Sequence, residues 1–128
     1  MLIAAVVFAG LAALVHVYIF VLETLRWEAP ATRRIFGTSE RDARITKPLA
    51  ANQGVYNLML AIVALVGASL AFAAPATGAA LILAGTGSML GAAVYLGATD
   101  RTKARPAVTQ GTFPLLAVLF TVLALALG

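Results

Sequence analysis

The chain of 128 residues contains no cysteine and only one histidine, His16. Without cysteine it forms no disulfide, has no thiolate nucleophile and offers no cysteine ligand to a metal. A single histidine does not supply the ligand set of a structural zinc site either, so we expect no metal. The sequence also lacks a nucleotide-binding motif that would indicate redox chemistry, and we expect no cofactor.

Charged residues are scarce as well, at 11% of the chain against 62% hydrophobic residues, and the mean hydropathy is +0.98. A typical soluble domain carries about 25% charged residues, so this composition predicts an integral membrane protein. A helix needs about 20 predominantly apolar residues to cross a membrane, and four stretches meet this condition: 2–26, 48–73, 75–98 and 107–127. None of them alternates as a barrel strand does. We therefore predict an all-α fold class, an integral membrane four-helix bundle that forms one domain over residues 1–128.

Positive charge is absent from most of the chain and gathers in two segments. All nine Lys and Arg residues lie between Arg26 and Lys47 or between Arg101 and Arg105. The positive-inside rule predicts that both segments are cytoplasmic loops and that both termini lie outside. The first apolar stretch lacks the basic start and the cleavage pattern of a signal peptide, so we expect it to be retained as a helix. Because membrane orientation accounts for the excess of basic over acidic residues, no nucleic-acid partner is expected.

The first basic segment also contains the apolar residues Ile35, Phe36 and Ile45. We predict a short helix from Thr38, capped by Thr38 or Ser39, that lies on the membrane surface. Two interpretations of the arginines in this segment stay open. They form an orientation signal that also contacts anionic lipid headgroups, or they hold the anionic tail of a substrate.

Prolines and glycines indicate where the helices end and how they pack. Pro75 marks the turn between the second and third helices, while Pro48 and Pro106 are expected at the starts of the second and fourth helices, where a missing N–H costs least. In the third helix Gly87 and Gly91 are four residues apart. That spacing predicts close packing against another helix or, alternatively, a face for a homo-oligomer.

The first apolar stretch carries two ionisable residues, His16 and Glu23, that a membrane helix does not need. Helix positions seven apart return to nearly the same face, so both lie on one stripe, and Trp27 continues it at the membrane interface. Seven residues span about 10 Å, too far for a direct bond between the two side chains. We therefore expect water, a ligand or side chains of other helices between them.

Further polar residues occur at similar depth in the other helices. Asn52 with Tyr56 and Gln53 with Asn57 form two i, i+4 pairs in the second helix. Counting from the cytoplasmic ends places Tyr95 of the third helix and Gln110 of the fourth helix level with Glu23, whereas the outer halves hold almost no polar side chain. In the fourth helix Pro114 is expected to kink the first turn and to leave the carbonyl of Gln110 free. Each unsatisfied polar group costs several kcal/mol in hydrocarbon, so we predict a polar pocket in the cytoplasmic half of the bundle.

Each of these residues also has a structural explanation. Glu23 can pair with Arg26 or Arg101, and His16 can be a buried histidine whose hydrogen bonds are satisfied. The amides of the second helix and Gln110 can cross-link helices, an effect worth about 1 kcal/mol each. Trp27 is typical of an interface anchor.

Three segments, "HVYIFVLE", "NQGVYNLMLA" and "VYLGAT…TQGTFPLLA", occur in this order over nearly the whole chain. In these motifs the sequence resembles a family of small four-helix bacterial membrane proteins known as domain of unknown function 1304. The resemblance implies a four-helix, multi-pass fold in the bacterial inner membrane and no established activity. The positions of the family's motifs are occupied here by His16, Glu23, Asn52, Gln53, Tyr56, Asn57 and Gln110.

Three functions stay open at this point. The first is an intramembrane enzyme that uses acid and base catalysis on a lipophilic small molecule, by epoxide opening or isomerisation, with membrane lipid around it. Its predicted catalytic residues are His16, Glu23 and Tyr56, and its predicted substrate-binding residues are Asn52, Gln53, Asn57, Tyr95, Gln110 and Trp27. The second is a proton-coupled exporter in which Glu23 exchanges a proton for its cargo. The third is a structural or assembly protein without catalysis.

Overall fold

The structure is a computed structural model that describes residues 1–128. Helix α1 continues directly into a π-helical segment, η1, and a short 3₁₀ turn, η2, precedes the last helix. The elements are α1 (Leu2–Phe20), η1 (Val21–Leu25), α2 (Pro30–Phe36), α3 (Glu40–Leu70), α4 (Pro75–Thr99), η2 (Arg101–Lys103) and α5 (Ala104–Leu127). No strand is present, so the all-α prediction is confirmed.

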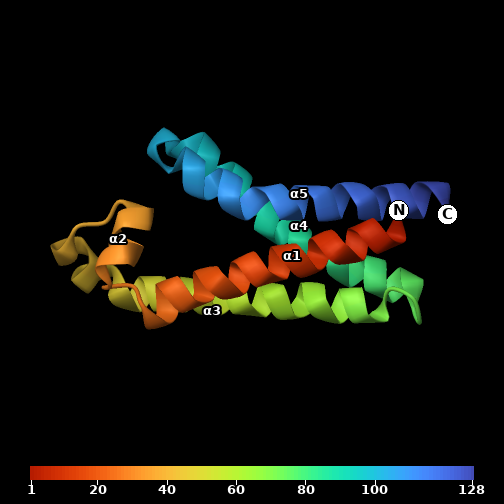
Figure 1. Cartoon of the computed structure of the whole chain (residues 1–128), viewed down its shortest axis with the longest axis horizontal. Helices are drawn as coiled ribbons and strands as arrows, with labels where there is room; N and C mark the ends of the chain where they lie inside the picture. Colours follow the sequence, from red (N-terminus) through yellow and green to blue (C-terminus); the bar gives the residue numbers. More distant parts are fainter.

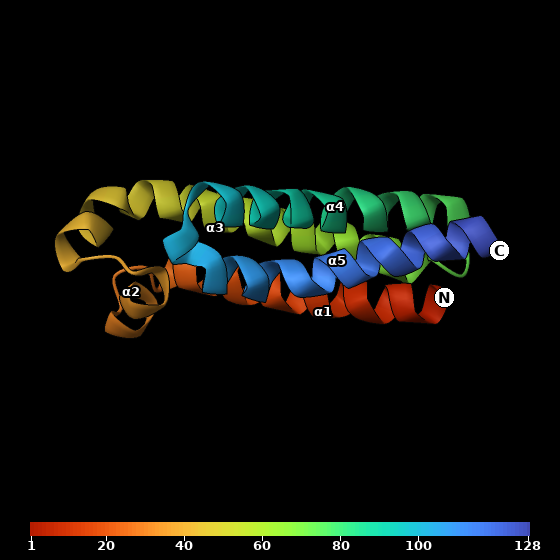
Figure 2. The ribbon, with the colours of Figure 1, turned by 90° about the horizontal axis from the view of Figure 1, so that it is seen from above.

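Four helical stretches are long and apolar enough to cross a membrane: α1 with η1, α3, α4, and η2 with α5. Around the bundle, α1 packs against α3 and α5, and α4 packs against the same two helices. Both termini lie at one end, and α2 and the turn between α4 and α5 lie at the other (Figure 1). The long helices run side by side in the second view as well (Figure 2). This length, composition and packing indicate a multi-pass membrane protein.

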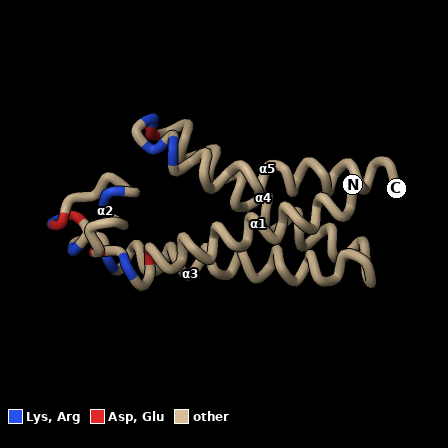
Figure 3. The backbone as a smooth tube through the Cα atoms, viewed as in Figure 1, with Lys and Arg blue, Asp and Glu red and all other residues tan.

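Charge is confined to one end of the bundle. Figure 3 shows almost all Lys, Arg, Asp and Glu residues on α2, on the first turns of α3 and at the turn between α4 and α5. We call this the charged end, and the opposite end the terminal end. Toward the charged end the pair of α1 and α3 diverges from the pair of α4 and α5 (Figure 1). A hydrogen bond from Lys103 Nζ to the carbonyl of Phe36 joins η2 to α2 there.

Within the turn between α4 and α5, Asp100 caps η2. Its carboxylate accepts hydrogen bonds from the hydroxyl and the backbone N–H of Thr102. The hydroxyl, followed by the backbone N–H, holds the pKa of the Asp100 carboxyl below its usual range. The turn therefore favours the ionised form of its acidic residue, to which the nearby Lys103 also contributes.

The interior of the bundle is built from small side chains. One buried cluster joins Ala12 and Ala13 of α1, Ala61 and Ala64 of α3, and Met89 of α4. Glycine brings α3 and α4 closer still, because a Cβ added to Gly67 would lie 2.6 Å from the backbone nitrogen of Ile82. Small residues allow such close backbone contact between membrane helices, where dispersion forces rather than the hydrophobic effect hold the helices together.

The second spanning helix begins earlier than the expected range of 48–73. Helix α3 starts at Glu40, and Pro48 lies inside it rather than at its start. Ser39 sets the start, because its Oγ accepts a hydrogen bond from the Asp42 N–H at 3.0 Å and donates one to the Asp42 carboxylate at 2.7 Å. The missing N–H of Pro48 frees only the carbonyl of Arg44, and that residue is exposed at the charged end. The short helix expected from Thr38 is therefore the first part of the spanning helix, whereas Pro106 does lie in the first turn of α5.

Gly87 and Gly91, whose spacing predicted close helix packing, do not make the close contacts inside the bundle. Helix α4 does pack against two neighbours, but a Cβ added to Gly87 or Gly91 would meet no atom within 4 Å. The close contacts involve Gly78 and Gly85 instead. The face with Gly87 and Gly91 points out of the monomer, and its use in a homo-oligomer stays a prediction.

Substituting Gly67 by alanine should lower the free energy of unfolding by about 1–3 kcal/mol, because the added methyl group meets backbone atoms that cannot move aside. The matched control is Gly87→Ala in the neighbouring helix, which adds the same methyl group to open space and should cost nothing. Unfolding of the two purified variants in mixed detergent micelles measures the difference. Equal losses for both variants would contradict the packing of α3 on α4.

Candidate functional site

The last turn of the first spanning helix has an unusual geometry. Residues Val21–Leu25 form the π-helical segment η1, which carries Glu23 near its centre. Such segments are rare and occur frequently at functional sites. Sequence reasoning missed this segment, since a regular helix was expected through residue 26.

Glu23 is half-buried, and one of its carboxylate oxygens is held by the neighbouring helix. Asn57 Nδ2 of α3 donates a hydrogen bond to Glu23 Oε2 at 2.9 Å. Asn57 is only 8% exposed, and the same amide nitrogen also donates to the backbone carbonyl of Gln53 at 3.2 Å. The other carboxylate oxygen, Oε1, has no protein partner. The site therefore presents one fixed and one free oxygen of a carboxylate inside a membrane-spanning segment.

Gly54 allows this contact to form. A Cβ at that position would lie 2.1 Å from Thr24 Oγ1 and 3.1 Å from Glu23 Cβ, so no other residue leaves room for η1. Thr24 Oγ1 then donates a hydrogen bond to the carbonyl of Ala51 at 3.1 Å. Neither Gly54 nor Thr24 was among the predicted site residues. The sequence did offer one signal for Gly54. It lies three residues before Asn57 and hence on nearly the same face of α3, where a glycine allows another helix to come close.

His16 lies deeper in the bundle and is 1% exposed. Its ring nitrogen Nδ1 is 2.9 Å from the carbonyl of Ala12, one turn earlier in the same helix. A carbonyl only accepts hydrogen bonds, so Nδ1 carries a proton, and in the neutral form of the ring the lone pair lies on Nε2. No protein atom bonds Nε2. The histidine is therefore held by its own helix and keeps a proton-accepting atom available.

The other predicted residues do not gather around Glu23. The side chains of Tyr56 and Tyr95 are 61% and 72% exposed, and those of Asn52 and Gln53 are exposed as well. Gln110 is half-buried and makes no side-chain hydrogen bond. Only Asn57 reaches the carboxylate. Counting along the sequence gives the depth of a residue in the membrane, but the direction of its side chain depends on how its helix is rotated. The substrate-binding and catalytic roles of the exposed residues stay predictions.

Trp27 and the two arginines suggested as partners of Glu23 lie elsewhere. Trp27 Nε1 donates to Thr46 Oγ1 at 3.1 Å, and its ring packs against Phe36 with 5.1 Å between the ring centroids. Neither Arg26 nor Arg101 contacts Glu23. The two ion pairs of the chain join Arg44 to Glu40 and Lys47 to Glu28.

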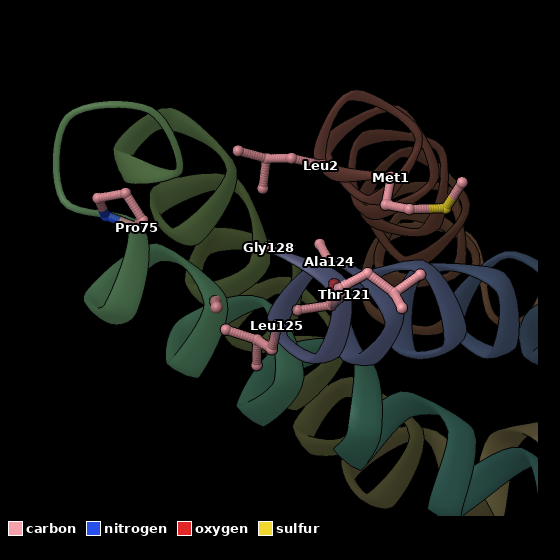
Figure 4. A pocket seen from close by; sticks show the side chains of 9 residues that line it. Met1, Leu2, Pro75, Thr121, Ala124, Leu125 and Gly128 are labelled. Carbon is pink, nitrogen blue, oxygen red and sulfur yellow. The ribbon is translucent and has the colours of Figure 1, made fainter.

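One cavity of the bundle lies away from these residues. It has a volume of about 370 Å³ and lies at the terminal end, between the start of α1, the start of α4 and the end of α5 (Figure 4). Its walls are mostly apolar, and the hydroxyl of Thr121 in them donates to the carbonyl of Ala117 in its own helix at 2.7 Å. No group of three His, Cys, Asp or Glu side chains in the chain is placed to hold a metal ion.

Comparison with known proteins gives one result. The model of the family described as "Protein of unknown function (DUF1304)" matches residues 10–122, which is most of the chain. The match includes α1 from Gly10 onward, η1, α3, α4 and most of α5. No curated protein and no solved structure matches the chain.

The hydrogen bond between Asn57 and Glu23 should appear as a coupling free energy in a double-mutant cycle. We expect the Glu23→Ala and Asn57→Ala variants to be coupled by about 1 kcal/mol, within the range measured for polar pairs between membrane helices. A second cycle that combines Glu23→Ala with Gln53→Ala serves as the control, because the Gln53 side chain is exposed. Unfolding in detergent gives both coupling energies, and the interpretation fails if the two cycles give the same value.

Proposed function

The chain belongs to the DUF1304 family, whose description assigns no activity, and from the geometry of its site we propose an acid and base enzyme of the bacterial inner membrane. Its substrate is a lipophilic small molecule, and the reaction is an isomerisation or an epoxide opening. The proposed site is reached from the cytoplasmic half of the membrane, with membrane lipid around the bundle.

The observation that carries this proposal is the environment of Glu23. The carboxylate is half-buried in a spanning segment, with Oε2 held by Asn57 at 2.9 Å and Oε1 without a protein partner. An ionisable group in a spanning segment is costly, and Oε1 stays accessible to a molecule that enters beside η1. The free oxygen supports a role toward a bound molecule.

His16 supplies the second proton-handling group of the proposed site. Its Nε2 lone pair accepts a proton, and the hydrogen bond from Nδ1 to Ala12 keeps the ring in the tautomer that this requires. Seven positions along a helix correspond to about 10 Å, so a substrate reaches both groups only if its reacting part spans the space between them. In an isomerisation one group removes a proton and the other returns one further along the molecule. In an epoxide opening one group takes the proton of an attacking water while the other protonates the epoxide oxygen.

The apolar surroundings of His16 support a lipophilic substrate. His16 lies beside the alanine cluster of α1 and α3, and Val17, Leu60 and Phe113 pack against that cluster. A polar substrate would lose its hydration there without compensation. The catalytic role of Tyr56 stays a prediction, and its side chain, exposed on α3, takes no part in the contacts around Glu23.

Glu23→Gln should abolish turnover while the protein stays folded, because glutamine still accepts the hydrogen bond from Asn57 but transfers no proton. Removing a general acid or base typically costs about 10²–10⁴-fold in rate. The measurement uses purified protein with a panel of lipophilic epoxides and unsaturated acyl compounds, whose products are identified by mass spectrometry. His16→Ala should give a loss of similar size.

A structural protein without catalysis would give a different outcome in these experiments. In that case Glu23→Gln and His16→Ala lower stability, and native mass spectrometry of the wild-type protein finds no bound lipophilic molecule. Proton-dependent uptake of a compound into vesicles containing the protein would instead show transport. Either result would overturn the enzymatic proposal.

The orientation in the membrane has its own test, which the cysteine-free chain makes simple. If the charged end is cytoplasmic, the single variant Thr38→Cys should react with a membrane-impermeant maleimide only after the cells are opened. Ala73→Cys, in the turn at the terminal end, should react in intact spheroplasts. The reverse pattern would contradict the proposed orientation.

A further inference from the structure

A second cavity lies at the charged end, where the first spanning segment stops and the chain turns toward α2. It has a volume of about 260 Å³ and is lined by residues 24–29 and by Lys47 of α3. This volume is below the range of about 300–1,000 Å³ that is typical for whole drug-sized ligands. The cavity therefore suits a small polar group rather than a complete lipophilic substrate.

Positive charge exceeds negative charge around this cavity. Its only carboxylate, Glu28, is paired with Lys47 at 2.5 Å. Arg33 adds a second cation at the edge, since its Nε donates to the backbone carbonyl of Glu28 at 3.2 Å. Arg26 lines the cavity and has no acidic partner. Because the pair of Lys47 and Glu28 is neutral overall, the excess positive charge comes from Arg26 in the lining and Arg33 at the edge, and it favours an anionic group in the cavity.

The wall formed by Trp27 is fixed in place. Its indole N–H is bonded to Thr46, and its ring is tilted by 56° against Phe36. Tryptophan in such a position is typical of the level of the lipid headgroups. Beside it, the side chain of Leu25 is 67% exposed at the end of the spanning segment. A molecule bound here would meet cations on one side and the apolar end of a membrane span on the other.

From this arrangement we propose that the cavity binds the phosphate of a phosphate ester, and that its occupant is the headgroup of an anionic phospholipid. A lipid fits better than a free phosphate because the exposed Leu25, at the end of the spanning segment, lines the cavity and would contact an acyl chain. Glu23 is not among the residues that line this cavity, which begins at the neighbouring Thr24, and the proposal does not depend on the enzymatic one.

The test uses the fluorescence of Trp27, the only tryptophan of the chain. The protein is placed in nanodiscs of phosphatidylcholine that contain a rising fraction of phosphatidylglycerol. We expect the Trp27 emission to change and to saturate with phosphatidylglycerol. Added glycerol phosphate or inorganic phosphate should produce no comparable change in pure phosphatidylcholine. If free phosphate gives the same response, the assignment to a lipid is wrong, and if no addition gives a response, the site is wrong.

Charge-matched variants separate this site from the general attraction between a basic loop and an anionic membrane. Arg26→Gln removes no hydrogen bond of the fold and should weaken the phosphatidylglycerol response about tenfold, as expected for loss of a charge-assisted contact. Lys47→Gln should weaken it as well. Arg41→Gln removes the same charge from an exposed position outside the cavity and should leave the response unchanged. Equal effects of Arg26→Gln and Arg41→Gln would overturn the proposal in favour of nonspecific surface attraction.

Discussion

The close approach of the π-helical segment to α3 at Gly54 determines the geometry of the candidate site. Without a side chain at this position, Thr24 reaches the backbone of Ala51 and Glu23 comes within hydrogen-bond distance of Asn57. A methyl group would separate the two helices at the point where the carboxylate is held. A neighbouring amide thus stabilises the ionisable Glu23 within the first span, where an unpaired polar group would be costly.

The same principle of close contact between small residues organises the rest of the bundle. Alanines and glycines line the interfaces of α1, α3 and α4, while most large aliphatic side chains lie on the outside, where lipid would contact them. Charge is restricted to the end with α2, and the two helix pairs diverge toward it (Figures 1 and 3). Polar chemistry, cations and the Trp27 cavity are therefore concentrated in one half of the molecule, and the other half is an apolar support.

The sequence predicted the all-helical fold and the four spans, because long apolar runs and clustered charges leave few alternatives. It also singled out His16, which the structure buries, and Glu23 and Asn57, which the structure joins by a hydrogen bond. It did not predict the direction of Asn52, Gln53 or Tyr95, since side-chain direction depends on helix rotation, and this is set by contacts such as that at Gly54. The π-helical segment was missed for a related reason. No residue type in Val21–Leu25 is specific for a π-helix, and the segment packs against α3, a contact that the sequence does not reveal.

The most direct test of this account is a distance measurement between Glu23 and Asn57 in a lipid bilayer. Solid-state NMR with ¹³C at the glutamate carboxyl carbons and ¹⁵N at the asparagine side chains reports such a contact, and the Asn57→Leu variant identifies its source. The account predicts a short carbon–nitrogen distance consistent with the 2.9 Å hydrogen bond, which disappears in the variant. A spectrum without this contact in the wild-type protein would contradict the account.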